Sequence, residues 1–496
     1  MTASRVATAV DVAVVGATKL CIGLIVWSTG FSALSDDDFS RVVIAQRWAV
    51  EPGIDPSGTS WLPLPFWITG AAMMAVDRSL GTARAVSLLL GVVSAILVYA
   101  AARLLCEHRR DAYLGALIAA VIPSAAVLGV ATVPELPTAA LAAVGVASAA
   151  SRDARHRLLG GGALLLACLS RYEPWFIAAG FALLTLRDGW QRRLRPLPSG
   201  RRLSAVAAVL AVAGPLLWML HNAFSHGDPL HFMARVAAYQ RALDGTTDAV
   251  WSGAVADLAA YPVQFVRQEP EIVLGLVVLL GVRIHEAQRA GVGVFAAVPS
   301  AARRTAFLLG LMIAGLSIAT IGGGAPTHHI GRPLVVAWLL SAVFIGAELS
   351  RRARELGPRT VAVGLGLCAT ALVVVALVVR PRVVPAEPFV DRNEQIALGR
   401  QVAMVVPADA RVLLQVVDYG YFAVLAASGR PESFIIDRSV DPRHGVRGSS
   451  FASAEALQAR LRQTGARFVV ANRVAKPAMT GSPIRKVGRW GLWSVR

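Results

Sequence analysis

The feature that most constrains this chain is a series of apolar stretches long enough to cross a lipid bilayer. A membrane-spanning helix needs about 20 consecutive apolar residues. The stretches that meet or approach this length are 12–34, 83–105, 112–134, 136–151, 203–220, 305–327, 333–347 and 360–379. Shorter apolar stretches cover 62–76, 158–170, 174–186 and 272–282. With 55% hydrophobic and only 16% charged residues, the composition excludes a disordered chain and an ordinary soluble one.

The placement of arginine predicts how these stretches are oriented. If the N-terminus is cytoplasmic and 62–76 lies along the membrane surface, about 11 stretches cross the membrane and 20 arginines fall in loops on the cytoplasmic side. Those loops lie around 103–110, 152–157, 187–202, 283–304 and 351–359. The positive-inside rule favours this orientation, and it also divides 158–186 into two short crossings. The net charge of +18 is explained in this way, so no nucleic-acid partner is expected.

The first apolar stretch is expected to be a retained anchor. No small-residue cleavage site follows it, as a removed signal peptide would require. Lys19 lies within this stretch, and its long side chain is expected to reach toward the cytoplasmic surface.

The last quarter of the chain changes character and predicts a second domain. From about 381 onward, short β-type runs alternate with helical ones. The β-type runs are Val412–Val417, Ser433–Ile436 and Arg467–Ala471, and the helical ones are Asp391–Met404 and Ala452–Gln463. We therefore expect an all-α polytopic membrane domain over 1–380 and a small extracytoplasmic α/β domain over 381–496. The first outer loop, 35–80, would carry juxtamembrane helices, and a second long outer loop would cover 221–270.

Three adjacent carboxylates, Asp36, Asp37 and Asp38, follow the first span at its outer end. Like charges at a membrane boundary repel one another and face partial desolvation, so such a cluster suits proton abstraction or a divalent cation. Aspartate is also a good N-cap for the helix that would follow over Phe39–Val50. The sequence leaves both interpretations open.

Other unusual residues are expected on the same outer side. Glu135 lies between two prolines where two spans meet, and Arg171 and Glu173 occupy a tight outer turn. A loop rich in polar residues runs from His221 to Leu230, and His328, His329 and Arg332 precede a span. Each feature alone is compatible with a cap or an ion pair. Their convergence on one side favours a site, and arginine and histidine there are suitable partners for a lipid phosphate.

These motifs resemble those of the GT-C-fold glycosyltransferases that use polyprenyl-phosphate-linked sugars, which include protein O-mannosyltransferases and aminoarabinose transferases of lipid A. Asp37 and Asp38, followed by an amphipathic segment, look like the acidic pair and juxtamembrane helix of that family. Pro63–Trp67 resembles its second juxtamembrane element, and Ser170–Glu173 a motif common in bacterial members. The resemblance covers roughly residues 10–380.

The resemblance implies a reaction and a set of site residues. A sugar would move, with inversion, from a polyprenyl-phosphate donor to a hydroxyl of a glycan, lipid or protein at the outer face of the cytoplasmic membrane. The implied catalytic residues are Asp37, Asp38 and Glu135. The implied donor-phosphate ligands are Arg84, Arg171, His328, His329 and Arg332, and the implied sugar or acceptor contacts are Trp61, Tyr172 and Glu173. The sequence leaves open whether Asp37 and Glu135 share a divalent metal ion.

The chain departs from the aminoarabinose transferases just before the proline element. Those enzymes carry a lysine there that is attributed to phosphate binding, whereas this chain reads Ser60-Trp61-Leu62. The phosphate is therefore expected to be held by other cations, and a lipid A substrate is not favoured.

A membrane transporter or lipid-linked-sugar flippase is the alternative interpretation. Transporters tend to place ionisable residues at mid-membrane and to show repeated halves. The sequence instead places its unusual charges at the outer boundary and shows no internal repeat.

Overall fold

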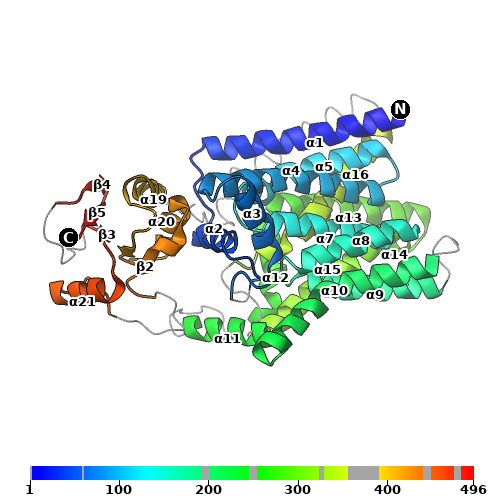
Figure 1. Cartoon of the computed structure of the whole chain (residues 1–496). Coiled ribbons are helices and arrows are strands. Elements are labelled where there is room, and N and C mark those ends of the chain that lie inside the picture. The colour runs from blue at the N-terminus through cyan, green and yellow to red at the C-terminus, as the bar shows by residue number, and fades with distance from the viewer. Residues whose placement is uncertain are drawn as a thin grey trace.

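The computed structural model describes residues 3–58, 61–191, 200–244, 254–322, 329–355, 390–439, 448–473 and 482–495. It has two parts, a helical bundle and a small α/β domain that packs against one end of it (Figure 1). We call this the domain-facing end of the bundle. The prediction of an all-α membrane domain followed by a small C-terminal α/β domain is confirmed. The proposed boundary near 380 and the predicted span 360–379 lie outside the described residues.

The bundle is built from helices that follow the predicted apolar stretches. They are α1 (Ala3–Ser28), α4 (Leu80–Leu105), α5 (Arg109–Val121), α6 (Pro123–Leu128), α7 (Glu135–Ala150), α8 (Ala154–Cys168), α9 (Pro174–Trp190), α10 (Gly200–His226), α12 (Ala254–Gln268), α13 (Pro270–Ala290), α15 (Ser300–Ile321) and α16 (Val335–Glu355). Short connecting elements are α14 (Val294–Ala297) and the 3₁₀ turn η1 (Arg332–Leu334). Smaller helices near the domain-facing end are α2 (Asp36–Trp48), α3 (Leu64–Ala75) and α11 (His231–Asp244).

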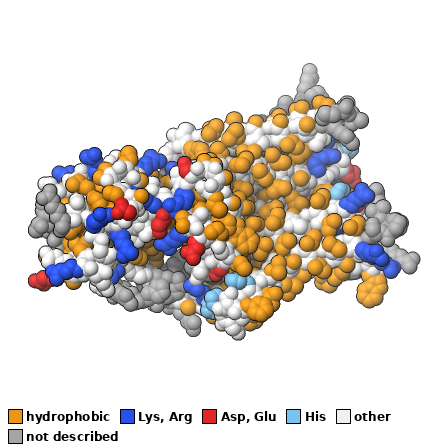
Figure 2. All heavy atoms as spheres, in the orientation of Figure 1, with side chains coloured by type: hydrophobic (Ala, Val, Ile, Leu, Met, Phe, Trp, Pro, Cys, Tyr) orange, Lys and Arg blue, Asp and Glu red, His pale blue; other side chains and the backbone are white. Residues whose placement is uncertain are grey.

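Several of these helices are long and apolar enough to cross a bilayer. In the described part of the chain they are Val6–Ser28, Leu80–Leu105, Gly200–His226, Ser300–Ile321 and Arg332–Glu355. Figure 2 shows hydrophobic side chains covering the visible side of the bundle, with basic side chains gathered at the end opposite the C-terminal domain. This distribution is that of a membrane protein.

Two predicted spans differ in detail from the helices observed. The stretch 112–134 is divided into α5 and α6, because Pro123 cannot continue the helix and begins a new one. The short stretch 272–282 lies within a 21-residue helix, α13. The helix has polar residues at both ends, so a count of apolar residues underestimates its length.

Lys19 does not reach the membrane surface, and that expectation is wrong. Its side chain is buried, and Nζ donates to the carbonyl oxygens of Ala120, at 3.3 Å, and Ala125. These carbonyls flank the break between α5 and α6, where Pro123 interrupts the helical hydrogen bonds. The ammonium group therefore binds backbone carbonyls beside the break, although that of Ala125 also accepts from the N–H of Gly129.

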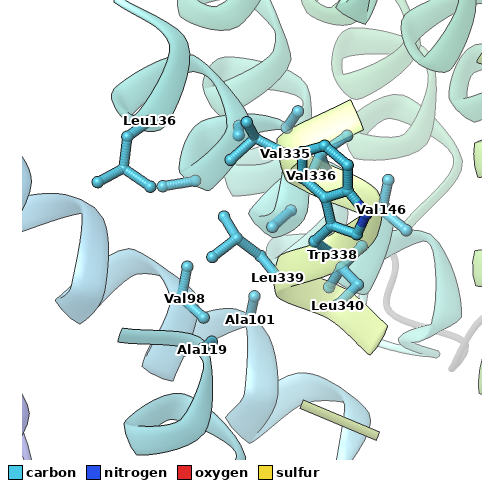
Figure 3. Packing of buried hydrophobic residues seen from close by; sticks show 14 of the residues in the cluster. Val98, Ala101, Ala119, Leu136, Val146, Val335, Val336, Trp338, Leu339 and Leu340 are labelled. Carbon is cyan, nitrogen blue, oxygen red and sulfur yellow. The ribbon is translucent and has the colours of Figure 1, made fainter. Parts of the chain in front are cut away.

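The core of the bundle forms where α16 packs against α5 and α7. Trp338 and Leu339 of α16 are buried beside Val146 of α7 and Ala119 of α5 (Figure 3). The close approach depends on glycine: a Cβ atom on Gly115 would lie 2.7 Å from the carbonyl oxygen of Val343. Small residues of this kind let membrane helices approach closely.

We expect Gly115→Ala to lower the apparent Tm of the purified protein measurably, because the new methyl group meets backbone atoms of α16 that cannot move aside. Overpacking of this kind costs about 1–3 kcal/mol. Gly162→Ala on α8 is the matched control, since a Cβ there meets nothing within 4 Å. Equal Tm values for the two variants would contradict this account of the α5–α16 contact.

The C-terminal domain contains a five-stranded mixed sheet in the order β2-β1-β3-β5-β4. Its strands are β1 (Val412–Leu414), β2 (Phe434–Ile436), β3 (Phe468–Asn472), β4 (Arg485–Val487) and β5 (Trp490–Ser494). Its helical elements are α19 (Asn393–Val405), α20 (Tyr421–Ser428), η3 (Pro431–Ser433) and α21 (Ala454–Thr464). β1 pairs in parallel with β2 and β3, and β5 is antiparallel to β3 and β4. The predicted strands coincide with β1, β2 and β3, whereas the β4–β5 hairpin was not predicted.

Helix α2 lies between the bundle and the C-terminal domain (Figure 1). Its buried Phe39 and Val43 belong to the same hydrophobic cluster as Leu425 of α20. Gln46 Nε2 also donates to the carbonyl oxygen of Ala426, at 2.8 Å. The same cluster includes Leu80 and Ala83 of α4, so α2, which begins with the acidic triplet, contacts both the bundle and the C-terminal domain.

Candidate active site

The three adjacent aspartates have three different environments. Asp36 accepts two hydrogen bonds of 2.9 Å from the guanidinium of Arg392, just before α19, and so ties α2 to the C-terminal domain. Asp38 is buried and accepts hydrogen bonds from the N–H groups of Ser35, at 3.1 Å, and Thr132, at 2.9 Å. Asp37 keeps 42% of its side chain exposed and lies 3.5 Å from Arg332 Nη1. Asp37 is therefore the member of the triplet most open to a substrate.

Asp38 holds the start of α2 in place. Ser35 and Asp38 form a capping box, and the bond to Thr132 connects α2 to the segment between α6 and α7. Burial raises the pKa of Asp38 to about 6, against the opposing effect of the Arg332 charge. The N-cap of α2 is therefore Ser35 and not an aspartate, and Asp38 contributes to the cap from the first turn of the helix.

The buried position of Asp38 leads to a prediction about pH. Because its pKa is raised in the folded protein, protonation stabilises the fold, and this stability is lost as the pH rises through about 6. We expect unfolding followed between pH 4 and 7 to show a free energy that falls most steeply near pH 5, by up to about 1.4 kcal/mol per pH unit from this group, and flattens above about pH 6. Asp38→Asn should remove that slope, and an unchanged slope would contradict the assignment.

A network of buried charges lies beside Asp37. Glu135 Oε1, at the start of α7, accepts from Arg171 Nη1 at 2.7 Å and from Arg332 Nη1 at 3.4 Å. Arg171 also donates through Nε to Glu173 Oε1 at 2.8 Å, with a further contact from Nη2. Arg332 Nη2 donates to the hydroxyl of Ser35 at 3.0 Å. We call Glu135, Arg171, Glu173 and Arg332 the charge network.

Local structure explains how distant segments deliver these residues to one place. Proline at the start of α9 ends the preceding turn, so Arg171 and Glu173 project from the short connection between α8 and α9. Arg332 begins the 3₁₀ turn that leads into α16. Burial opposes the charge on Arg171, but Glu173 and Glu135 more than compensate, so the pKa of its guanidinium is raised. The two carboxylates thus favour the charged form of Arg171 in a buried position.

A small pocket with a mostly apolar lining adjoins the charge network. Its lining includes Glu135, Thr138, Arg171, Glu173 and Arg332, together with apolar residues such as Met312. Glu135 Oε2 and Thr138 Oγ1 are buried there without a hydrogen-bond partner in the described part of the protein. Buried polar atoms are normally satisfied, so these two are suited to a ligand or to water.

The remaining predicted site residues lie outside the network. Arg84 donates to the carbonyl oxygen of Ser32, at 2.7 Å, and so holds the connection between α1 and α2. Tyr172 stacks on Phe232 of α11, with ring centroids 4.8 Å apart. The carbonyl of His329 accepts from the N–H of Arg332. His328 is outside the described residues.

Arg41 of α2 is a residue that the sequence analysis did not include in the site. Its side chain is 7% exposed, and its guanidinium carbon lies 4.2 Å from the ring centroid of Trp61. The signal that could have found it is its spacing from Asp37, because residues four apart share one face of a helix.

The residues present do not favour a metal shared by Asp37 and Glu135. Arg332 contacts both carboxylates, so a cationic side chain already provides the charge that a metal would supply. Within the described ranges, no group of three or more His, Cys, Asp or Glu side chains is arranged to hold a metal ion.

Comparison with known proteins assigns the fold. The family described as dolichyl-phosphate-mannose-protein mannosyltransferase matches residues 56–218. ArnT from Cupriavidus metallidurans bound to undecaprenyl phosphate superposes with a TM-score of 0.57 at 14% identity, over 96% of both chains. Its apo structure gives the same score and identity over 99% of this chain and 98% of that one. No curated protein matches the sequence significantly.

A second solved structure points to the same fold. The oligosaccharyltransferase AglB from Archaeoglobus fulgidus, in complex with an inhibitory peptide and a dolichol-phosphate, has a TM-score of 0.52 at 13% identity. The match covers 96% of this chain and 70% of that one. The chain therefore has the GT-C fold, and the resemblance inferred from its motifs is confirmed. Together with the apolar helices, the matches support a membrane glycosyltransferase.

Proposed function

We propose that this protein transfers a sugar from a polyprenyl-phosphate donor to an acceptor hydroxyl at the outer face of the cytoplasmic membrane. The acceptor oxygen attacks the anomeric carbon, the bond from that carbon to the phosphate oxygen breaks, and the configuration inverts. Asp37 takes the acceptor proton as general base. One observation carries this proposal: Asp37 is half-exposed and lies 3.5 Å from an arginine of a buried charge network, whereas its two neighbours are engaged elsewhere.

The charge network supplies what the leaving group needs. A phosphodiester that becomes a monoester gains negative charge, and cations fixed in advance stabilise that charge in the transition state. Arg332 contacts Asp37 and Glu135 together, and Arg171 shares Glu135 with it. Glu135 thus holds both guanidinium groups in position, a role in keeping with its burial. His328 and His329 stay candidates for the same phosphate.

The membrane orientation is part of the proposal. The end of the bundle that carries the charge network would face outward, together with the C-terminal domain, and the N-terminus would be cytoplasmic. The basic side chains at the opposite end of the bundle support this orientation (Figure 2). Trp61 packs on Arg41 of α2, and Tyr172 packs on Phe232 of α11, two helices near the domain-facing end. Interfacial aromatic residues are expected at that end, and a sugar or an acceptor would enter there.

The distribution of charge favours a transferase over a transporter or flippase. Ion pairs of the described bundle lie either in the charge network or toward the opposite end, where Arg157 pairs with Asp188 and Arg354 with Asp111. The core between them, around Trp338, is packed with apolar side chains (Figure 3). A transport path would need polar groups along that core.

The proposed function is tested by mass spectrometry of cell-envelope glycans and glycolipids, with and without the gene for this chain. We expect one glycan or glycolipid to lose a sugar in the deletion strain and to regain it on complementation. An unchanged set of envelope glycans and glycolipids, with the chain shown to be expressed in the parent strain, would contradict glycosyl transfer.

A further inference from the structure

The most unusual cation of the site is Arg41, which is buried but takes no part in the charge network. Its Nε is buried without a hydrogen-bond partner, and no hydrogen bond or ion pair joins its guanidinium to another described residue. Its contacts are with aromatic faces, at 4.2 Å from the ring centroid of Trp61 and 5.8 Å from that of Phe66.

Such an arrangement does not stabilise the empty protein. A guanidinium has five N–H donors, and a buried charged donor without an acceptor is unfavourable. The aromatic rings offset part of that cost and hold the group in a fixed orientation, but they accept none of its hydrogen bonds. Burial lowers the pKa of Arg41, while the charges of Glu135 and Asp37 act to raise it.

The position of Arg41 points toward the site. It lies one helical turn beyond Asp37 on α2, so both side chains share one face of that helix. Arg171 and Arg332 are close enough for their charges to act on it. Arg171 donates to carboxylates, and Arg332 donates to a carboxylate and to the hydroxyl of Ser35, whereas the Nε–H of Arg41 has no acceptor in the described part of the protein.

We propose that Arg41 binds the phosphate group of the lipid-linked donor, with its guanidinium oriented by Trp61. A phosphate has several oxygens that can accept hydrogen bonds. The planar guanidinium of arginine can donate to two of them at once, in a bidentate manner. The inference rests on the proposed function, because it assigns a ligand to the same site.

The test measures binding of undecaprenyl phosphate to the purified full chain in detergent, with inorganic phosphate and undecaprenol as separate probes. Arg41→Met keeps the apolar stem over Trp61 and removes the charge, Arg41→Lys keeps the charge, and Arg47→Gln changes an exposed arginine of the same helix. We expect Arg41→Met to weaken binding of undecaprenyl phosphate about 10- to 100-fold and Arg41→Lys to weaken it less. Arg47→Gln should bind like wild type.

Thermal stability separates binding from a merely structural role. Without ligand, Arg41→Met should have a Tm equal to or above that of wild type, because it removes an unsatisfied buried charge. Undecaprenyl phosphate should raise the Tm of wild type and Arg47→Gln more than that of Arg41→Met. If Arg41→Met does not yield folded protein, the affinity of Arg41→Lys for undecaprenyl phosphate becomes the test. Lysine keeps the positive charge but lacks the planar fork of donors.

Three other outcomes would each overturn a different part of the proposal. Wild-type affinity in Arg41→Met, or in Arg41→Lys where that variant decides, would overturn the role of Arg41 and leave the proposed function standing. Equal affinity of wild type for inorganic and undecaprenyl phosphate would overturn the assignment to a lipid. Folded wild type that binds no lipid phosphate would overturn the proposed donor, and the inference with it.

Discussion

Asp37→Asn is expected to reduce sugar transfer at least about 100-fold, the lower end of what a general base contributes. Asparagine keeps the size and position of the side chain but cannot take the acceptor proton. The contact with Arg332 is long, at 3.5 Å, and the side chain is 42% exposed, so the fold has little to lose. The measurement is the amount of modified glycan or glycolipid in a deletion strain complemented with the variant.

Glu51→Gln is the matched control for this variant. Glu51 is an exposed carboxylate of the same segment, just beyond the end of α2, and its amide variant should restore the modification fully. Membrane levels and Tm of both variants should equal those of wild type. Full activity of Asp37→Asn at wild-type protein levels would remove Asp37 from the mechanism, and a comparable loss in Glu51→Gln would show that the effect is not specific.

The acidic triplet shows how far sequence reasoning extends into this site. The motif predicted a cluster of functional carboxylates, and its alternative predicted a helix cap. The structure shows that Asp38 has the contacts of the cap and Asp37 lies at the charge network. The third aspartate could not be assigned, because its partner Arg392 lies 356 residues further along the chain. Local spacing reports nothing about such a contact.

The same limit applies to the cations. Arg171, Glu173 and Arg332 stood out because each is a charged residue in a short turn between apolar stretches, and the fold brings them together at Glu135. Arg84 is also an arginine at the boundary of an apolar stretch, but it donates to the backbone carbonyl of Ser32 and not to a carboxylate. Whether an arginine at a membrane boundary faces a carboxylate or the main chain depends on tertiary packing, which the sequence pattern does not contain.

The fold was more accessible than the site. The lengths of the apolar stretches predicted the positions of most helices, because a bilayer imposes a length on each helix that crosses it. The β4–β5 hairpin was missed because the exposed edge strand β4 is short and basic, although Trp490, Leu492 and Trp493 of β5 are buried.

Glu135→Leu is expected to destabilise the protein by about 3–5 kcal/mol, the cost of removing one partner from a buried ion pair. Glu135 is 2% exposed and is shared by Arg171 and Arg332. Leucine fits the volume but leaves both guanidinium groups with one carboxylate fewer in a buried site. The Tm of the purified protein should fall by several degrees, and transfer should be lost because the cations are no longer positioned.

The control for this effect is an ion pair of similar length at the surface. Glu432 pairs with Arg78 at 2.8 Å, but its side chain is 47% exposed, so Glu432→Leu should change stability by no more than about 1 kcal/mol. The contrast between the two variants tests burial, since both lose a carboxylate bound to arginine. A Tm for Glu135→Leu that matches Glu432→Leu would mean that water or another acceptor compensates Arg171 and Arg332. The charge network would then not be held together by Glu135, and its role in positioning the two arginines would have to be abandoned.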